Sequence, residues 1–171
     1  MAMDHDGPEI LAEINVLQAD LALPAHQEAI VALVDAYAQD PMGGGHPLAP
    51  EVKRALIPGL QRHPTTIVFL AYDRGAAVGV AVCFLGFSTF NARPLINIHD
   101  LGVLPSHRGR GVGSRLMAAV ERKARDLGCC KLTLEVLENN LRARQVYAKL
   151  GFAQAVYQEG AGGALFFTKS V

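Results

Sequence analysis

The stretch that most restricts how this 171-residue chain can fold is VLPSHRGRGVGS, residues 103–114. It overlaps the end of LINIHDLGVL (95–104), a run rich in residues that favour β-strands, and it precedes a run with apolar residues at helical spacing that ends at Gly128. A second strand-like run, KLTLEVL (131–137), comes next. A strand, a helix and a strand in this order predict two parallel strands joined by a right-handed crossover.

The rest of the chain predicts antiparallel strands at the edges of the same sheet. Further strands are expected at 9–18, 66–72, 76–87, 153–158 and 164–168, with Asp73-Arg74-Gly75 as one hairpin loop and EGAGG as another turn. For 9–18 a helix is the alternative, because the run is short. Helices are expected at 24–39, from Pro50 to His63-Pro64, and at 140–149, closed by Gly151. The stretch MGGGHPLAP (42–50) is interpreted as a flexible connection. The expected fold class is therefore α/β with a mixed sheet.

Composition limits the partners and the compartment. Lysine plus arginine and aspartate plus glutamate number 16 each, so no charge excess argues for nucleic acid or an acidic membrane as partner. The N-terminus MAMDHDGPEI lacks the pattern of a secretory signal, and no apolar stretch reaches membrane-spanning length, so we expect a cytoplasmic protein. The three cysteines, Cys83, Cys129 and Cys130, match neither a disulfide framework nor a zinc site, so we expect no metal.

The glycine-rich corner offers a binding place for a negative group. A helix that begins near Gly111 leaves its first backbone N–H groups without intrahelical partners, and the helix dipole favours an anion there. The glycines remove side chains that would block the approach, while Arg108 and Arg110 add positive charge. The corner is therefore predicted to bind phosphate or pyrophosphate without a metal.

Three other interpretations of this corner fit its residues less well. A flexible turn with solvated arginines is the plain alternative, and the position between a strand and a helix makes it the weaker one. A Walker loop requires a lysine that Gly113-Ser114-Arg115 does not contain, so ATP hydrolysis is not expected. A dinucleotide fingerprint from Gly109 would need a third glycine where Ser114 stands, which leaves an NAD enzyme as a weak alternative.

Two motifs are similar to those of the GNAT superfamily of N-acetyltransferases. The acetyl-CoA loop of that family has the form Arg/Gln-x-x-Gly-x-Gly/Ala, and residues 108–113 read RGRGVG. The second signature, Asn-x-x-Ala-x-x-x-Tyr followed by Gly-Phe, resembles NLRARQVYAKLGF (140–152). The order of elements over 9–169 also resembles that fold, which implies one GNAT domain over 1–171 with helices on both faces of the sheet. Residues 87–113 most resemble the diamine (spermidine/spermine) acetyltransferases.

The resemblance implies where acetyl-CoA binds. Its pyrophosphate would lie on the backbone of residues 109–114, its pantetheine arm would pair like an added strand with residues 101–103, and Asn140 would hydrogen-bond near that arm. Gly102 suits a bulge or a close backbone approach. The cofactor residues expected on these grounds are Leu101, Gly102, Val103, Arg108, Gly109, Arg110, Gly111, Val112, Gly113, Ser114 and Asn140.

The resemblance also implies the acid–base groups. Tyr147 occupies the place of the family's proton donor to the departing thiolate, although from helical spacing alone Tyr147 would be a packing residue. The diamine acetyltransferases carry a glutamate nine positions before the loop arginine, where this chain has His99, a residue that can accept a proton near neutral pH. Strand alternation directs the neighbouring Asp100 to the opposite face. A backbone N–H near Val103 would stabilise the oxyanion.

The acceptor amine would enter opposite the cofactor, between the two N-terminal helices and the turn after the long third strand. The candidates that could bind it are Asp35, Asp40, His46, Phe87, Ser88, Phe90 and Asp100. Aspartates suit a cationic amine, while a solvated helix face is the plainer interpretation of Asp35 and Asp40.

Together these residues predict transfer of acetyl from acetyl-CoA to a small primary amine by direct attack in a ternary complex, with neither metal nor cysteine-linked intermediate. The alternatives are a catalytically silent acyl-CoA-binding module and an acetyltransferase acting on protein N-termini or lysines. Dimers are common in the family, and the C-terminal strands could form a homodimer.

Overall fold

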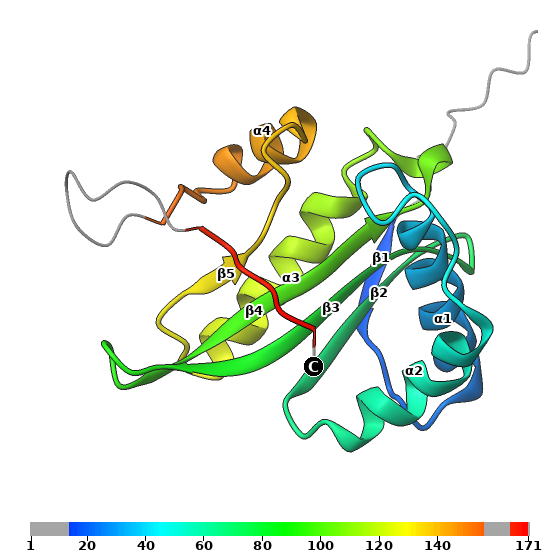
Figure 1. Cartoon of the computed structure of the whole chain (residues 1–171), viewed down its shortest axis with the longest axis horizontal. Coiled ribbons are helices and arrows are strands. Elements are labelled where there is room, and N and C mark those ends of the chain that lie inside the picture. The colour runs from blue at the N-terminus through cyan, green and yellow to red at the C-terminus, as the bar shows by residue number, and fades with distance from the viewer. Residues whose placement is uncertain (1–13, 156–164, 171) are drawn as a thin grey trace, which may run out of the picture. The chain divides into compact units, whose positions relative to one another are not determined.

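The computed structural model describes residues 14–155 and 165–170 and divides the chain into two compact units, 1–135 and 136–171. The first unit contains a five-stranded sheet in the order β1-β2-β3-β4-β5 (Figure 1). Its strands are β1 (Asn15–Gln18), β2 (Thr66–Asp73), β3 (Ala76–Ser88), β4 (Arg93–Val103) and β5 (Leu132–Leu134). Neighbouring strands from β1 to β4 run antiparallel, while β4 and β5 run parallel. The predicted mixed sheet with one parallel pair is confirmed.

Three helices of this unit cover the sheet. They are α1 (Pro24–Ala38), α2 (Pro50–Arg62) and α3 (Val112–Asp126), with the short 3-10 helix η1 (Pro105–His107) before α3. Both α1 and α2 begin at a proline, whose fixed φ and missing N–H suit the first helical turn. Helix α2 stops at Arg62 because Pro64 disfavours a helical conformation at His63.

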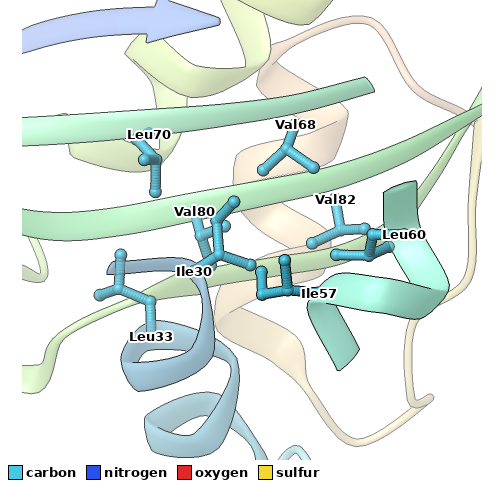
Figure 2. Packing of buried hydrophobic residues seen from close by; sticks show 8 residues of the cluster. All are labelled: Ile30, Leu33, Ile57, Leu60, Val68, Leu70, Val80 and Val82. Atoms are coloured by element: carbon cyan, nitrogen blue, oxygen red, sulfur yellow. The ribbon is translucent and has the colours of Figure 1, made fainter. Parts of the chain in front are cut away.

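The core lies on both faces of the sheet. Figure 2 shows the cluster between the sheet and α1 with α2, formed by Ile30, Leu33, Ile57, Leu60, Val68, Leu70, Val80 and Val82. Helix α3 packs on the strands from the other face with a buried stripe of Val112, Leu116, Met117, Ala119, Val120 and Ala124. Burying each larger aliphatic side chain of this kind contributes about 1.5–3 kcal/mol. The two layers fix β4 and the start of α3 relative to each other.

The connection between α1 and α2 is more ordered than expected. The N–H of Gly43 donates to the carbonyl of Asp40 at 2.8 Å, and that of Gly44 donates to the carbonyl of Ala38 at 2.9 Å. The Asp40 carboxylate accepts from the N–H of Met42 at 2.8 Å. The expected flexible connection is therefore a hydrogen-bonded turn that continues the C-terminus of α1.

The second unit contains α4 (Leu141–Lys149), which confirms the helix predicted at 140–149. The backbone of Gly151 is left-handed, with φ 86°, as a residue that ends a helix requires. The predicted final strand pair is not seen in the described residues, because 153–155 and 165–168 form no strand there. The other residues of that prediction, and residues 9–13 of the predicted first strand, lie outside the described residues.

Candidate functional site

The C-terminal half of β4 has an open backbone edge. Strand β5 pairs with β4 only at Ile96, Asn97 and Ile98, whereas β3 pairs with β4 as far as Val103. Within the described part of the first unit, residues 99–103 therefore have a strand neighbour on one side and none on the other. This is the edge that residues 101–103 were predicted to offer to an added strand.

Hydrogen bonding shows which groups face that edge. The N–H of Leu104 donates to the carbonyl of Val78 in β3 at 3.0 Å. Backbone groups alternate along a strand, so the N–H and C=O groups of Val103 and Leu101 point away from β3. An extended ligand laid along β4 would find these groups available, with the carbonyl of Val103 also receiving a hydrogen bond from Arg108 at 3.1 Å.

The start of α3 lies directly after this edge. Gly111 precedes the helix with φ 79°, a left-handed conformation that costs an ordinary residue about 1–2 kcal/mol. Among the residues that the structure describes, no side chain caps this terminus, and its first turn contains no acidic residue. The first helical hydrogen bond is from the N–H of Arg115 to the carbonyl of Gly111. The N–H groups of Val112, Gly113 and Ser114 thus precede the helical ladder and face an uncapped terminus.

The two loop arginines are both paired with aspartates. Arg110 contacts the Asp73 carboxylate at 3.2 Å, and the same oxygen lies 3.2 Å from Nε2 of His107. Asp73 is buried at the end of β2. Arg108 donates to the Asp40 carboxylate at 2.7 Å. The side chain of Arg110 is 46% exposed and that of Arg108 is 34% exposed, so Arg110 is the more accessible cation.

Two glycines bring the helices close to the strands here. A Cβ on Gly79 would lie 3.0 Å from Val112 Cγ1 and 3.1 Å from Leu116, so this glycine lets the first turn of α3 rest on β3. A Cβ on Gly102 would lie 3.1 Å from the Cβ of Tyr37 in α1. Sequence reasoning missed the role of Gly79 and the contact between Gly102 and Tyr37, since neither pairing has a local signal.

A β-bulge in β4 changes the directions predicted for His99 and Asp100. Val82 is opposite Asp100, but the next residue, Cys83, is opposite Ile98, so His99 is the extra residue. Asp100 therefore shares its side of the sheet with Val82, whose side chain belongs to the core under α1 and α2. The expectation that alternation places Asp100 on the opposite face from His99 is wrong.

The ring of His99 lies on this same side. Its centroid is 5.6 Å from that of Phe84, which packs against the core cluster under α1 and α2. His99 is exposed and Asp100 is half-buried. The structure thus brings both polar side chains to the α1 face, immediately before the open edge of β4.

The surroundings of Asp100 and Tyr37 shift the pKa of both side chains. Burial raises the pKa of the Asp100 carboxyl above its usual value, and the nearby His99 opposes this by lowering it. Burial also raises the pKa of the Tyr37 phenol, with further increases from the charges of Asp100 and Asp40. Asp100 is therefore the carboxyl in this region whose surroundings move it toward the pH range of a general base.

The other aspartates predicted for the amine already have partners. Asp35 accepts from the N–H of Leu48 at 2.8 Å and from Lys53 at 2.7 Å. Asp40 accepts from Met42 and Arg108, as described above. Both therefore hold the α1–α2 connection in place, and binding of a cationic amine by Asp35 or Asp40 stays a prediction. His46 is exposed and contacts the carbonyl of Gly44 in its own turn.

Three further predicted acceptor residues lie away from the loop. Phe87, Ser88 and Phe90 are at the tip of the β3–β4 hairpin, next to the first residue of β4 (Figure 1). The glycine loop follows the last residue of β4, and at about 3.3 Å per residue an 11-residue strand separates the two ends by roughly 30 Å. The structure does not bring these residues together with His99 and Asp100. Phe90 and Phe87 are exposed, and Ser88 is buried.

The second motif forms its own local structure in unit 136–171. The side chain of Asn140 caps α4 by accepting from the N–H of Ala143 at 3.1 Å. The ring of Tyr147 lies 5.9 Å from that of Phe152, whose N–H donates to the carbonyl of Tyr147 at 2.9 Å. Asn140 therefore has a structural role that the sequence analysis did not assign, and the role of Tyr147 as proton donor stays a prediction.

The described residues contain neither a cluster of metal ligands nor a helix that could span a membrane. Among residues 14–155 and 165–170, no group of three or more histidine, cysteine, aspartate or glutamate side chains is placed to hold a metal ion. In the same ranges, no helix has the length and apolar character needed to cross a bilayer.

The fold and the loop define an α/β domain in which an uncapped helix start follows the end of a parallel strand. Residues 30–152 match the Acetyltransferase (GNAT) family, and the chain belongs to that family. This confirms the resemblance on which the residue roles were based, and it confirms the expected fold class.

Known proteins that resemble the chain act on different acceptors. It is 37% identical over 83 residues to the thialysine N-epsilon-acetyltransferase of Bos taurus, over 48% of either chain. It is 35% identical over 89 residues to the N-alpha-acetyltransferase MAK3 of Arabidopsis thaliana, over 52% of this chain and 46% of that protein. The chain therefore spans about half the length of these relatives.

The likeness to solved structures extends further along the chain. The aminoglycoside N-acetyltransferase AAC(6')-Iy, solved in complex with CoA, superposes with a TM-score of 0.72 over 93% of this chain and 96% of that one. The sequence identity is 24%, so this likeness concerns the fold.

Proposed function

We propose that the chain transfers the acetyl group of acetyl-CoA to a small primary amine by direct attack in a ternary complex. The observation that carries the proposal is the uncapped, left-handed start of α3 directly after a strand edge without a partner. An extended chain ending in a diphosphate is the ligand that such an arrangement accommodates, because the edge offers alternating backbone groups and the helix start offers N–H donors.

Each part of the cofactor has a counterpart. The pyrophosphate accepts from the N–H groups of residues 112–114, with Gly109 and Gly111 keeping the approach free of side chains. The pantetheine arm pairs with the outward groups of Leu101 and Val103. Arg110 supplies the more accessible positive charge beside the phosphates.

Asp100 is the general base of this proposal. The lone pair of the amine nitrogen must attack the thioester carbon, so the substrate ammonium first gives a proton to a carboxylate. Asp100 lies beside the open edge of β4, and its raised pKa favours that transfer. His99 lies on the same face of the sheet, where its imidazole relays the proton to Asp100 or orients the amine.

The remaining steps use a backbone N–H of β4 and the residue that the family resemblance assigns as the acid. A backbone N–H near Val103 donates to the developing oxyanion. As the tetrahedral intermediate collapses, the C–S bond breaks and the thiolate of CoA takes a proton from the Tyr147 phenol. The nitrogen, which carries a positive charge after the attack, gives up its second proton to solvent, and solvent returns a proton to Tyr147. The products are an N-acetylated amine and free CoA.

The acceptor class follows from charge. Asp100 is a carboxyl on the α1 face of the sheet, beside the open edge of β4, and it favours a primary ammonium over a neutral or anionic acceptor. The named relatives support an amine acceptor of some kind, since one is named for thialysine and one for an α-amine. The latter keeps acetylation of a protein N-terminus as the second candidate function.

The test is the release of free CoA thiol across a panel of polyamines, thialysine, aminoglycosides and N-terminal peptides, together with calorimetry of CoA binding. Turnover with a small amine supports the proposal, and turnover confined to peptides selects the second candidate. Binding without any turnover means a silent acyl-CoA-binding module instead. The Asp100→Asn variant should lose about 100- to 10,000-fold in kcat together with the acidic limb of the pH profile, the size expected for a general base. An unchanged profile contradicts the assignment of the base.

A further inference from the structure

Arg108 of the glycine loop is held by protein atoms on two sides. Its Nε donates to the carbonyl of Val103 at the end of β4 at 3.1 Å, and its Nη2 donates to the carboxylate of Asp40 at 2.7 Å. Asp40 lies 68 positions earlier in the chain, directly after α1. The guanidinium therefore ties the loop and the strand edge to the α1–α2 connection.

Asp40 is well placed to be the fixed end of this contact. Its carboxylate is 14% exposed, and its other oxygen accepts from the N–H of Met42 at 2.8 Å. The bond from Met42, followed by the bond from Arg108, holds the pKa of Asp40 below its usual value, so the carboxylate is ionised at neutral pH. The turn that presents it is itself closed by hydrogen bonds from Gly43 and Gly44.

We infer that Asp40 is a positioning residue for the acetyl-CoA loop, which acts through Arg108 and couples cofactor affinity to the α1–α2 connection on the acceptor side. This rests on the proposed function, and it changes the part expected of both residues. Arg108 is a clasp between protein segments, and Asp40 is its anchor. Arg110 is left as the arginine that reaches the phosphates.

The geometry gives a reason for the coupling. The carbonyl of Val103 belongs to the strand edge that would hold the pantetheine arm, and Gly109 to Ser114 would hold the diphosphate. Arg108 lies between the two and its direction is set by Asp40. Without the hydrogen bond from Arg108 to Asp40, the guanidinium no longer holds the end of β4 and the glycine loop in one arrangement, and both must be reordered when the cofactor binds. That ordering costs free energy, so affinity falls.

The test is calorimetry with CoA on the full chain, comparing wild type with Asp40→Asn, Arg108→Gln and the double variant. The matched control is Asp35→Asn, because Asp35 is also on the α1 side and also accepts from a backbone N–H and a basic side chain, but touches no loop residue. Asp40→Asn and Arg108→Gln should each raise the Kd for CoA about three- to ten-fold. The Kd of the double variant should be no higher than that of the single variant that binds CoA more weakly. The control should stay within about two-fold.

Steady-state kinetics with the best amine of the panel separate positioning from chemistry. Asp40→Asn should raise KM for acetyl-CoA while kcat stays within about two-fold, and Asp40→Glu should restore part of the affinity. If Asp40→Asn is unfolded at the assay temperature, Arg108→Gln leaves the Met42 bond intact and provides the same comparison.

Two results would overturn the inference. A wild-type Kd in the Asp40→Asn variant shows that the anchor has no effect, and additive losses in the double variant show that Arg108 binds phosphate by itself. Failure of the wild type to bind CoA is a different result, because it removes the proposed function and this inference together.

Discussion

The starts of α3 and α4 show how the same backbone feature serves two purposes. Helix α4 has its cap, since the side chain of Asn140 accepts from the N–H of Ala143. Helix α3 has none, begins at the left-handed Gly111 and carries no acidic residue in its first turn. Helix α4 satisfies a terminal N–H donor with the side chain of its own N-cap residue. The first N–H groups of helix α3 have no such acceptor, which costs stability unless a ligand binds there.

A negative charge placed at each start gives the sharpest contrast. Gly111→Glu should weaken CoA binding by at least about 100-fold, because the carboxylate competes for two or more charge-assisted hydrogen bonds of the diphosphate. The paired change Asn140→Asp should leave folding intact, because aspartate caps a helix as well as asparagine. Calorimetry and thermal unfolding measure the two effects. Unchanged CoA affinity in Gly111→Glu removes the loop from the binding site.

A milder change at α3 should separate stability from function. Ser114→Asp adds an acid to the first turn and should stabilise the free protein by about 0.3–1 kcal/mol through the helix dipole. The same charge should weaken CoA binding about ten-fold by repulsion at the N–H groups. Denaturant unfolding without and with CoA tests both halves. A variant that gains stability and keeps full affinity would show that the terminus is not the phosphate site.

Removing the cap of α4 should affect folding more than cofactor binding. Asn140→Ala should lower stability by about 1 kcal/mol, because the N–H of Ala143 loses its acceptor. If Asn140 also binds the pantetheine arm, as the family resemblance implies, CoA affinity falls as well. Comparing the Kd for CoA in this variant with that in Asn140→Ser, which keeps a capping oxygen, decides between the two roles.

The smallest expected effect on stability is that of the Asp100 carboxyl, whose charge, like the donors at the start of α3, is not fully satisfied by the protein. Its raised pKa means that the folded state binds this proton more tightly than the unfolded chain. The resulting stabilisation is complete below the unfolded pKa and is lost as pH rises through the folded pKa. Asp100→Asn, which stays neutral, should therefore be more stable than wild type at pH 7 and equal to it near pH 3. Chemical denaturation at the two pH values measures this.

The local parts of the fold could be predicted from the sequence. The strands around Asp73-Arg74-Gly75, the helix after the glycine loop and the helix ending at Gly151 each carry their own periodicity and turn residues. The position of the loop was predictable because its glycines, Gly109, Gly111 and Gly113, carry no side chains and leave the backbone N–H groups at the start of the next helix accessible.

The strand register and the ion pairs on the α1 side could not be predicted from local rules. The bulge at His99 adds one residue to β4 without any marker in the sequence, and it reverses the alternation that placed Asp100. Asp35 and Asp40 looked free because their partners, Lys53 and Arg108, lie 18 and 68 positions away. Phe87 and Phe90 were predicted from the turn after the long third strand, and β4 separates that turn from the glycine loop.

By itself the sequence determined most of the helices and strands, the crossover and the exposed donors at the start of α3, because hydrophobic period and glycine placement act over a few residues. Only the tertiary structure decided which charges are already paired, which face Asp100 joins and why residues 79 and 102 are glycines. These depend on contacts between segments far apart in the chain, where packing distance and strand register, rather than residue preference, set the outcome.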